Sequence, residues 1–414
     1  MRIQFRLSSL LMEMRFSLEF SRIIIICFLQ FFIIGCFSGA NNKSVSPTLS
    51  LQYDDKAHHI VKKSLFKNGK VNIDLSEEGK KLKITEILGS YKYVILETLP
   101  ESLLGSISKV LLKDRRIFVL DYKMSKAVFV FDINGKFIYK VAPKKSDLYM
   151  PLDICLVEKN LYILSEGTVS KYSVENGELI ETFNLPFKAI SFAPVESKNE
   201  TFNFFVNKNA NTGIGLNLDF EFFTLDLNKR KILKEQIRST NRDAATFALF
   251  NFFYRDKETF FTKTNVDTVF EVKTDSIVPI LNIKFEKSKA VKSASNSLLC
   301  NFMATPKFYY CSRVTEGKLY HIYINRQNNR FVKVKLIIDN RFLGSFNSTP
   351  VGASGEDFIF LIDPAALKYN LAKHKDKGDS LSITKLFKDA CGLESEVKRT
   401  DNPILVFAKP NFYE

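Results

Sequence analysis

The sequence contains little of the material from which recognisable catalytic sites are built. Only four of its 414 residues are histidines, at positions 58, 59, 321 and 374. It has no G-x-S-x-G nucleophile elbow, no H-E-x-x-H zinc motif, no phosphate-binding loop and no dinucleotide-binding fingerprint. These absences argue against the enzyme classes that such motifs identify. They favour a protein that binds a partner over one that converts a substrate.

Long apolar runs are also scarce, and the one near the start of the chain predicts export. Residues 23–34 form an apolar run broken only by Gln30, and Arg15 and Arg22 precede it. A run of this length is short for a membrane span and typical of a signal peptide. It ends in Ile-Ile-Gly-Cys at residues 33–36, which resembles the bacterial lipobox.

We therefore expect residues 1–35 to be a lipoprotein signal peptide and Cys36 to be the lipid-attachment site. The alternative is a plain membrane anchor in which the Gly-Cys pair occurs by chance. The arm before Arg15 is longer than is usual for a signal peptide, so the true start, at Met1, Met12 or Met14, stays open.

Residues 36–69 are mostly polar and of mixed composition, with Ser, Asn and Lys, and we interpret them as a tether between the lipid and the folded domain. His58 and His59 lie in this segment, close to Asp54 and Asp55. No cysteine or second histidine pair completes a familiar set of metal ligands there. We expect exposed tether histidines, and no metal or other cofactor is predicted.

Cysteine usage excludes one more kind of site. No C-x-x-C pair occurs, which argues against structural zinc. An exported chain permits disulfides, and Cys300 and Cys311 could face each other on neighbouring strands. The alternative is that the cysteines are small buried apolar residues without a disulfide. The sequence leaves the state of this pair open.

Basic residues outnumber acidic ones, and the formal net charge is +15. Without residues 1–35, which carry four arginines and two glutamates, it is +13. The lysines and arginines are scattered, which is typical of solvated strand faces and loops. We expect no nucleic-acid partner for an exported chain, and weak attraction to anionic envelope surfaces is the better interpretation.

What the sequence does contain is a β-repeat, clearest in residues 109–141. Apolar runs at 110–112, 117–120, 128–131 and 137–141 are rich in β-branched and aromatic residues, with polar turns between them. Asn134-Gly135 predicts a tight hairpin, because both residue types accept positive φ. Four antiparallel strands in this span are typical of one propeller blade.

The pattern recurs at a period that suits propellers. Residues 152–157, 161–164, 169–174 and 179–183 repeat the order, and the hairpin glycine recurs 42 positions on, from Gly135 to Gly177. At this period residues 70–414 provide six to eight blades, and six if loops are long. We expect strands at 71–75, 82–88, 91–96, 190–192, 202–206, 222–227, 232–235, 247–254, 260–262, 268–272, 277–285, 300–303, 307–312, 319–325, 331–337, 358–362 and 404–408.

Two further expectations concern the ends of this domain. Residues 71–75 and 404–408 are the candidates to close the ring by pairing within one blade. Residues 364–372 and 381–390 favour helix, as an insertion in the last blade. The predicted fold is therefore all-β: a single six-bladed β-propeller over residues 70–414, behind the signal and the tether.

Several segments, in this order, resemble a known family. The layout is similar to that of six-bladed β-propeller lipoproteins of the Bacteroidetes envelope, relatives of the NHL-repeat propellers. The resemblance implies a lipidated propeller, and it implies no catalytic residues because the family has no agreed ones. It is carried by residues 93–98 with 104–107, 117–121, 128–135, 267–272 with Pro279, and 401–406.

Few single residues are candidates for chemistry. His321 lies in an alternating strand pattern and is more simply a packed strand residue than a general base. His374 lies in a charged loop. Asp121, Asp132 and Asp226 follow strands and suit turn capping, although they could line a metal-bearing pore. We therefore predict no catalytic residues and no metal ligands.

The function that we infer from the sequence is non-catalytic binding by a cell-envelope lipoprotein. The partners would be the membrane, through the lipid, and a glycan, peptide or envelope protein. The alternative is a periplasmic propeller hydrolase or lyase with a pore metal. We expect an outer-membrane lipoprotein, facing the periplasm or the cell surface. Ligand identity, membrane face and oligomeric state stay open.

Overall fold

The computed structural model of the chain places most of residues 79–411. The described residues are 52–53, 70–74, 79–142, 150–196, 198, 200–206, 211, 220–238, 251–255, 257–263, 266–286, 298–315, 318–375 and 388–411. All of them belong to one compact unit, Leu51–Glu414. The predicted signal peptide and Cys36 lie outside the described residues.

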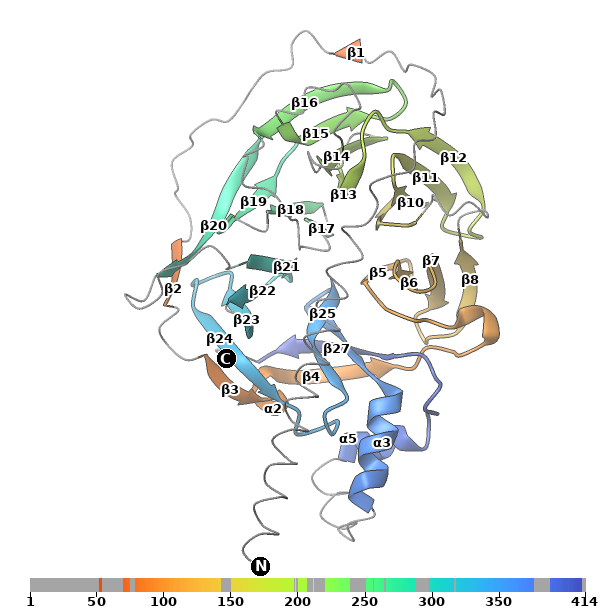
Figure 1. The fold of residues 1–414 in the computed structure, drawn as a ribbon, viewed down its shortest axis with the longest axis vertical. Coiled ribbons are helices and arrows are strands. Elements are labelled where there is room, and N and C mark those ends of the chain that lie inside the picture. Colours follow the sequence, from red (N-terminus) through yellow and green to blue (C-terminus); the bar gives the residue numbers. More distant parts are fainter. Residues whose placement is uncertain are drawn as a thin grey trace, which may run out of the picture. The chain divides into compact units, whose positions relative to one another are not determined.

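Six sheets, each built on four antiparallel strands, are arranged in a ring as a β-propeller, which confirms the predicted fold (Figure 1). Each sheet is one blade, counted along the chain. Blade 1 comprises β5 (Lys109–Lys113), β6 (Arg116–Asp121), β7 (Ala127–Asp132) and β8 (Phe137–Val141). Blade 2 comprises β9 (Asp153–Val157), β10 (Asn160–Ser165), β11 (Thr168–Ser173) and β12 (Leu179–Asn184). Blade 3 comprises β13 (Ala189–Pro194), β14 (Thr201–Val206), β15 (Phe220–Asp226) and β16 (Lys231–Arg238).

The remaining three blades follow the same antiparallel order. Blade 4 comprises β17 (Phe252–Arg255), β18 (Glu258–Thr262), β19 (Thr268–Val272) and β20 (Ile277–Glu286). Blade 5 comprises β21 (Leu298–Ala304), β22 (Phe308–Thr315), β23 (Lys318–Asn325) and β24 (Phe331–Ile338). Blade 6 comprises β25 (Phe346–Ser354), β26 (Asp357–Ile362), β27 (Ile404–Pro410) and β4 (Leu88–Val94).

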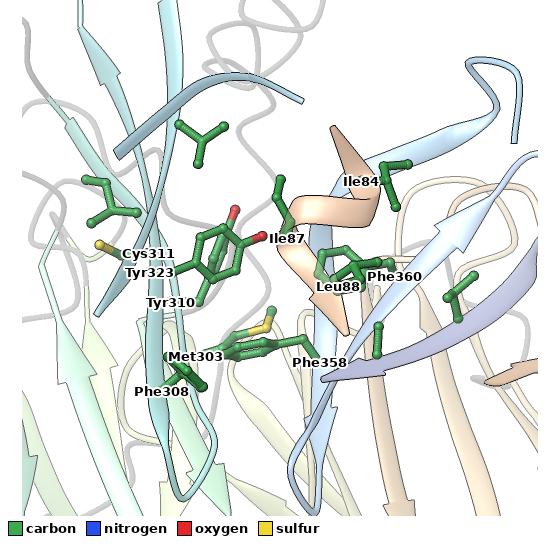
Figure 2. Packing of buried hydrophobic residues seen from close by; sticks show 14 of the residues in the cluster. Ile84, Ile87, Leu88, Met303, Phe308, Tyr310, Cys311, Tyr323, Phe358 and Phe360 are labelled. Carbon is green, nitrogen blue, oxygen red and sulfur yellow. The ribbon is translucent and has the colours of Figure 1, made fainter. Parts of the chain in front are cut away.

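The core lies between the facing sheets of neighbouring blades. Apolar residues of one strand face alternate with those of the other, so each blade contributes side chains to two seams. One cluster joins Val110 and Phe129 of blade 1 to Ile359 and Phe407 of blade 6. At the seam between blades 5 and 6, Tyr310 packs on Phe358, with 5.9 Å between their ring centroids (Figure 2).

The N-terminal part of the described chain runs along the outside of the ring. Three short strands add in parallel to the outermost strands of successive blades. They are β1 (Gln52–Tyr53) on β16, β2 (Lys70–Asp74) on β20 and β3 (Lys80–Lys83) on β24. We call these three strands the strap. β1 falls within the segment that the sequence predicts to be a tether.

Ring closure occurs in blade 6, but not with the predicted partner. β27 pairs on one side with β26 and on the other with β4, so residues 404–410 meet residues 88–94. The expectation that residues 71–75 would pair with 404–408 is wrong, because that segment serves as the strap strand of blade 4. The chain thus combines three C-terminal strands and one N-terminal strand in its last blade.

Helices occur at two places. The predicted strand at 82–88 is wrong in its second half, since Ile84–Ile87 form a helical turn, α2, which buries both isoleucines at the seam between blades 5 and 6 (Figure 2). The predicted insertion in blade 6 contains α3 (Pro364–Lys375) and α5 (Lys388–Glu394). Asp363 caps α3 by accepting a hydrogen bond from the backbone N–H of Ala365, 2.8 Å away.

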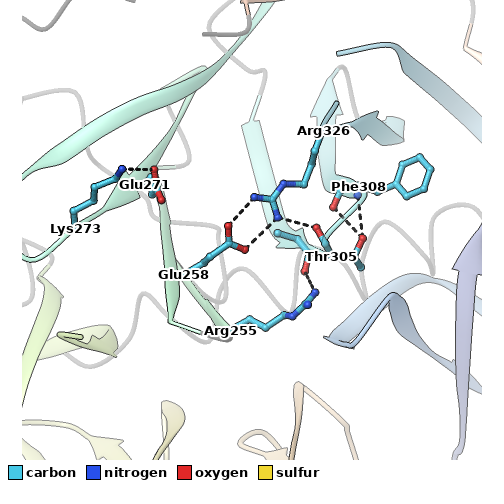
Figure 3. A network of polar contacts seen from close by, with 8 residues as sticks. Arg255, Glu258, Glu271, Lys273, Thr305, Phe308 and Arg326 are labelled. Atoms are coloured by element: carbon cyan, nitrogen blue, oxygen red, sulfur yellow. Dashed lines mark hydrogen bonds and ion pairs between the residues drawn. The ribbon is translucent and has the colours of Figure 1, made fainter. Parts of the chain in front are cut away.

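Polar clamps hold neighbouring blades together. Between blades 4 and 5 the guanidinium of Arg326 binds both carboxylate oxygens of Glu258, at 3.1 and 2.7 Å, and donates to the carbonyl of Thr305 at 2.9 Å (Figure 3). It also lies over the ring of Tyr309, 4.7 Å from the centroid. Such a bidentate, stacked arginine fixes the angle between two sheets.

The structure bears on two questions that the sequence leaves open, the state of the cysteines and the presence of a membrane-spanning helix. None of the four described cysteines is joined in a disulfide, including Cys300 and Cys311. Among the described residues no helix has the length and apolar character needed to cross a membrane.

Candidate functional site

The two ends of the ring differ in their connections. The innermost strand of every blade begins at one end, which we call the loop face, and runs towards the other, which we call the turn face. Because strands alternate in direction, the links between blades and between second and third strands belong to the loop face. The links from first to second and from third to fourth strands belong to the turn face.

The turn face has short links only, whereas the loop face carries all of the long links together with some short ones such as 166–167 and 185–188. The turn face has two-residue links such as 114–115 and 158–159, and its longest link is 195–200. The loop face receives the links 95–108, 142–152, 207–219, 239–251, 287–297 and 363–403. The long links are therefore concentrated at the loop face, and binding residues are usually carried by such loops on a rigid scaffold.

An exposed apolar pair lies on the described part of the loop face. Leu103 is 49% exposed and Met124 is 70% exposed. They come from different links, but the hydroxyl of Ser125 donates to the carbonyl of Leu103 at 3.3 Å, so the two links are in contact. We call Leu103 and Met124 the apolar patch.

Charged side chains also bridge the blades near this face. Asp153 at the start of β9 is fully buried, and its Oδ1 accepts from Lys109 Nζ at 2.6 Å and from its own neighbour's N–H. Its Oδ2 accepts from the N–H of Phe192 in blade 3, at 3.2 Å. Burial raises the pKa of the Asp153 carboxyl, and the ammonium of Lys109 opposes that rise. One carboxylate thus links three blades.

Comparable ion pairs connect the next two seams. Lys263 and Glu221 lie 2.6 Å apart and are both buried, joining blades 3 and 4. Arg313 and Asp267 lie 2.6 Å apart and join blades 4 and 5. A buried pair is costly to break because the remaining charge stays desolvated. These contacts therefore help to fix how neighbouring blades meet near the loop face.

A hydrogen-bonded group around His321 lies at the seam between blades 5 and 6. β25 pairs with β26 at Asn347↔Leu361 and again only at Gly352↔Ile359, so residues 348–351 bulge out of the ladder. Pro350 within this bulge has no N–H to donate. The bulge turns Ser348 towards the neighbouring blade, which is a common role of bulges.

The bulge brings a hydroxyl to each side of one imidazole. Ser348 Oγ lies 3.1 Å from His321 Nε2, and Tyr310 Oη lies 2.9 Å from His321 Nδ1. Burial lowers the pKa of His321 to about 4, so the ring is neutral near pH 7. A neutral ring has one N–H and one lone pair. If Nδ1 carries the proton, Nε2 can accept the hydrogen of Ser348; in the other tautomer it donates to Ser348.

The predicted roles of the aspartates as turn caps are confirmed. Asp121 accepts from the N–H groups of Gly105, Ser106 and Met124. Asp132 accepts from the N–H of Asn134 at 2.8 Å, and Asp226 accepts from that of Lys229 at 2.9 Å. All of these carboxylates hold turns or links in place.

The histidines have different outcomes. His321 is confirmed as a packed strand residue of β23 and is 4% exposed. His374 lies in α3, where the sequence interpretation had a charged loop, while His58 and His59 lie outside the described residues. Within the described ranges no three His, Cys, Asp or Glu side chains come close enough to hold a metal ion.

Sequence reasoning missed Ser348, Lys109 and Asp153. Ser348 and His321 are 27 positions apart on different blades, and only the bulge brings them together. The one local signal was the Pro-Val-Gly run at 350–352, which is unusual inside a strand. Lys109 and Asp153 each begin an innermost strand 44 positions apart, close to the blade period, and that spacing could have identified them.

The fold places this chain among the six-bladed β-propellers, with its long links at one end of the ring. Within that class the chain belongs to the family described as "Domain of unknown function (DUF4934)", which matches residues 70–409. The comparison with curated proteins found no match.

One solved structure supports the fold. A Bacteroides fragilis protein described as a candidate exported protein superposes with a TM-score of 0.66 at 14% identity, covering 83% of this chain and 99% of its own. The WD40 domain of Pan2 from Neurospora crassa has a TM-score of 0.39 at 10% identity, covering 69% of this chain and 82% of its own. At these identities the first likeness shows the fold alone, and the second carries no further argument.

Proposed function

We propose that this protein is a cell-envelope lipoprotein, anchored through Cys36, whose propeller binds a ligand at the loop face without converting it. The observation that carries the proposal is the asymmetry of the ring: the long links gather at one face, and no link at the other face is longer than 195–200. The similar Bacteroides fragilis protein is described as exported, which supports an envelope location.

The ligand classes that fit are a glycan, a peptide or an envelope protein. The apolar patch offers the kind of surface on which a sugar ring or an apolar side chain packs, with polar links around it. An uncharged glycan or an apolar side chain makes no ion pair with the protein, so we expect its affinity for the apolar patch to depend little on salt.

The experiment is a screen of the purified protein against arrays of envelope glycans and peptides, with matched variants. The double variant Leu103→Glu with Met124→Glu changes the apolar patch. Gln327→Glu, at an exposed position of the turn face, is the control. We expect the double variant to lose at least tenfold in affinity for the best array ligand and the control to stay within twofold. Equal effects would contradict binding at the loop face.

One observation favours a second candidate, a serine hydrolase. The hydroxyl of Ser348 lies within hydrogen-bond distance of a neutral imidazole, as an acylating serine requires. In that reaction Ser348 Oγ would add to a carbonyl carbon as its proton moves to His321 Nε2. The imidazolium would then give this proton to the departing alcohol or amine, and water would release the acyl group from Ser348. A fluorophosphonate probe decides the matter, because it labels only activated serines. Labelling of Ser348 that disappears in His321→Gln would favour hydrolysis, and binding alone predicts no labelling.

A further inference from the structure

The outer edge of blade 2 differs from the other outer edges of the ring. Blades 3, 4 and 5 each end in a strap strand, and blades 1, 2 and 6 end in β8, β12 and β4. Within the described residues these last three strands pair on one side only. An unpaired strand edge presents a row of N–H and C=O groups that can pair with another strand.

Two of the three open edges are protected by lysine. β8 carries the exposed Lys140, and β4 carries the exposed Lys92. Lysine on an edge strand is a common device against unwanted pairing, because burying its ammonium is costly. β12 has no lysine: its sequence is Leu-Ile-Glu-Thr-Phe-Asn, and Leu179 and Ile180 are 50% and 53% exposed.

The segment 175–184, which contains β12, is acidic, whereas the protein as a whole is basic. Glu175, Glu178 and Glu181 are all exposed, and no lysine or arginine occurs from 175 to 184. None of these three forms an ion pair with another described residue. A partner that covers this edge therefore meets apolar side chains flanked by acidic ones, and basic residues complement them.

We propose that β12 is the docking site for an extended, lysine- or arginine-bearing segment of a partner protein, which adds as a fifth strand of blade 2. The chain itself shows this mode of pairing three times. β2, for example, lies parallel to β20 from Lys70↔Asn282 to Asp74↔Glu286. Main-chain hydrogen bonds supply affinity in such strand addition, and alternate side chains supply selectivity. This site is separate from the ligand-binding loop face proposed above.

The test uses the full-length protein in detergent and a fluorescent ten-residue peptide that alternates lysine with valine. Two companion peptides divide the interaction into its parts. One has proline at a central valine, which removes an N–H from the ladder, and the other has glutamate in place of lysine. We expect the first peptide to bind and both companions to bind at least tenfold more weakly, as measured by fluorescence anisotropy.

Variants of the protein then locate the peptide. The double change Leu179→Ser with Ile180→Ser removes the exposed apolar pair of β12. The matched control is Leu336→Ser with Ile338→Ser, since these residues are 49% and 41% exposed on β24, whose edge β3 already covers. We expect about a tenfold loss of affinity for the β12 variant and a change within twofold for the control, with melting temperatures alike.

Three outcomes would overturn the proposal. The first is a wild-type protein that does not bind the lysine peptide. The second is equal weakening by both double variants, because the peptide would then not be located at β12. Equal binding of the proline peptide would count in the same way, because charge attraction without strand pairing would then account for the binding. The third is a wild-type protein that is dimeric by light scattering and becomes monomeric in the β12 variant, because the occupant would then be a second copy of this chain.

Discussion

At the scale of single residues, burial sets the proton affinity of His321. Burial lowers its pKa to about 4 in the folded protein, against 6.5 for an ordinary histidine. Between these two values the unfolded chain binds a proton that the folded protein does not, so stability rises with pH across this window. The contribution is fully present above about pH 6.5 and is lost as the pH falls to 4, by about 3 kcal/mol in all.

This predicts a difference in acid sensitivity between the wild type and His321→Gln. We expect the wild-type free energy of unfolding to fall by about 2 kcal/mol more than that of the variant between pH 7 and pH 4.5. Urea titrations at the two pH values measure it, and the carboxylates shared by both proteins cancel in the comparison. Parallel pH dependences would show that the imidazole is not desolvated as the structure indicates.

Gly352 is required by a close approach between blades. A Cβ atom at this position would lie 2.3 Å from the backbone oxygen of Val110 in blade 1, so the two innermost strands would have to separate. We expect Gly352→Ala to destabilise the protein by about 2 kcal/mol, as overpacking does. Gly392→Ala is the control, because nothing lies within 4 Å of the added atom there. Thermal melts compare the two, and equal melting temperatures would refute the close approach.

Single-residue roles were predictable from the sequence where the cause is local. Asp132 caps its hairpin through N–H groups two and four positions on, and Gly135 in the same turn has φ of +90°. The neighbours of His321 were not predictable. Ser348 reaches it from another blade through a bulge, and no sequence window contains both.

At the scale of elements, strands with strong alternation were predictable and irregular ones were not. All four strands of blade 1 occur where the apolar runs predicted them. β25 escaped prediction because Pro350 and Gly352 disrupt its pattern, and α2 was mistaken for strand because residues 82–88 are β-prone. The order of strap strands around the ring depends on long-range pairing, which local patterns do not encode.

Blade 6 predicts an unequal response to two C-terminal deletions. Removing residues 403–414 takes out β27, which pairs with strands on both sides, and leaves the edges of β26 and β4 unpaired. We expect this variant to lose cooperative unfolding. Removing residues 412–414, which follow that strand, should change the melting temperature little. A cooperative melt for the longer deletion would show that the ring does not depend on closure at β27.

At the scale of the whole molecule, the proposed lipid anchor at Cys36 would hold the propeller at a membrane. The lipobox-like residues 33–36 predict that Cys36→Ser abolishes lipidation and releases the protein from membranes. Labelling with radioactive palmitate and fractionation of cells expressing each form measure both effects. Incorporation of label into the Cys36→Ser variant would contradict lipid attachment at that residue.

The central claim is that the loop face is where the propeller binds its ligand, and hydrogen–deuterium exchange tests it most directly. The protein is compared with and without the best ligand from the glycan and peptide arrays. We predict slower exchange in the links 95–108 and 122–126, which carry the apolar patch, and unchanged exchange in the turns 114–115 and 326–330. Protection confined to the turn face, or conversion of the ligand during the measurement, would contradict the account.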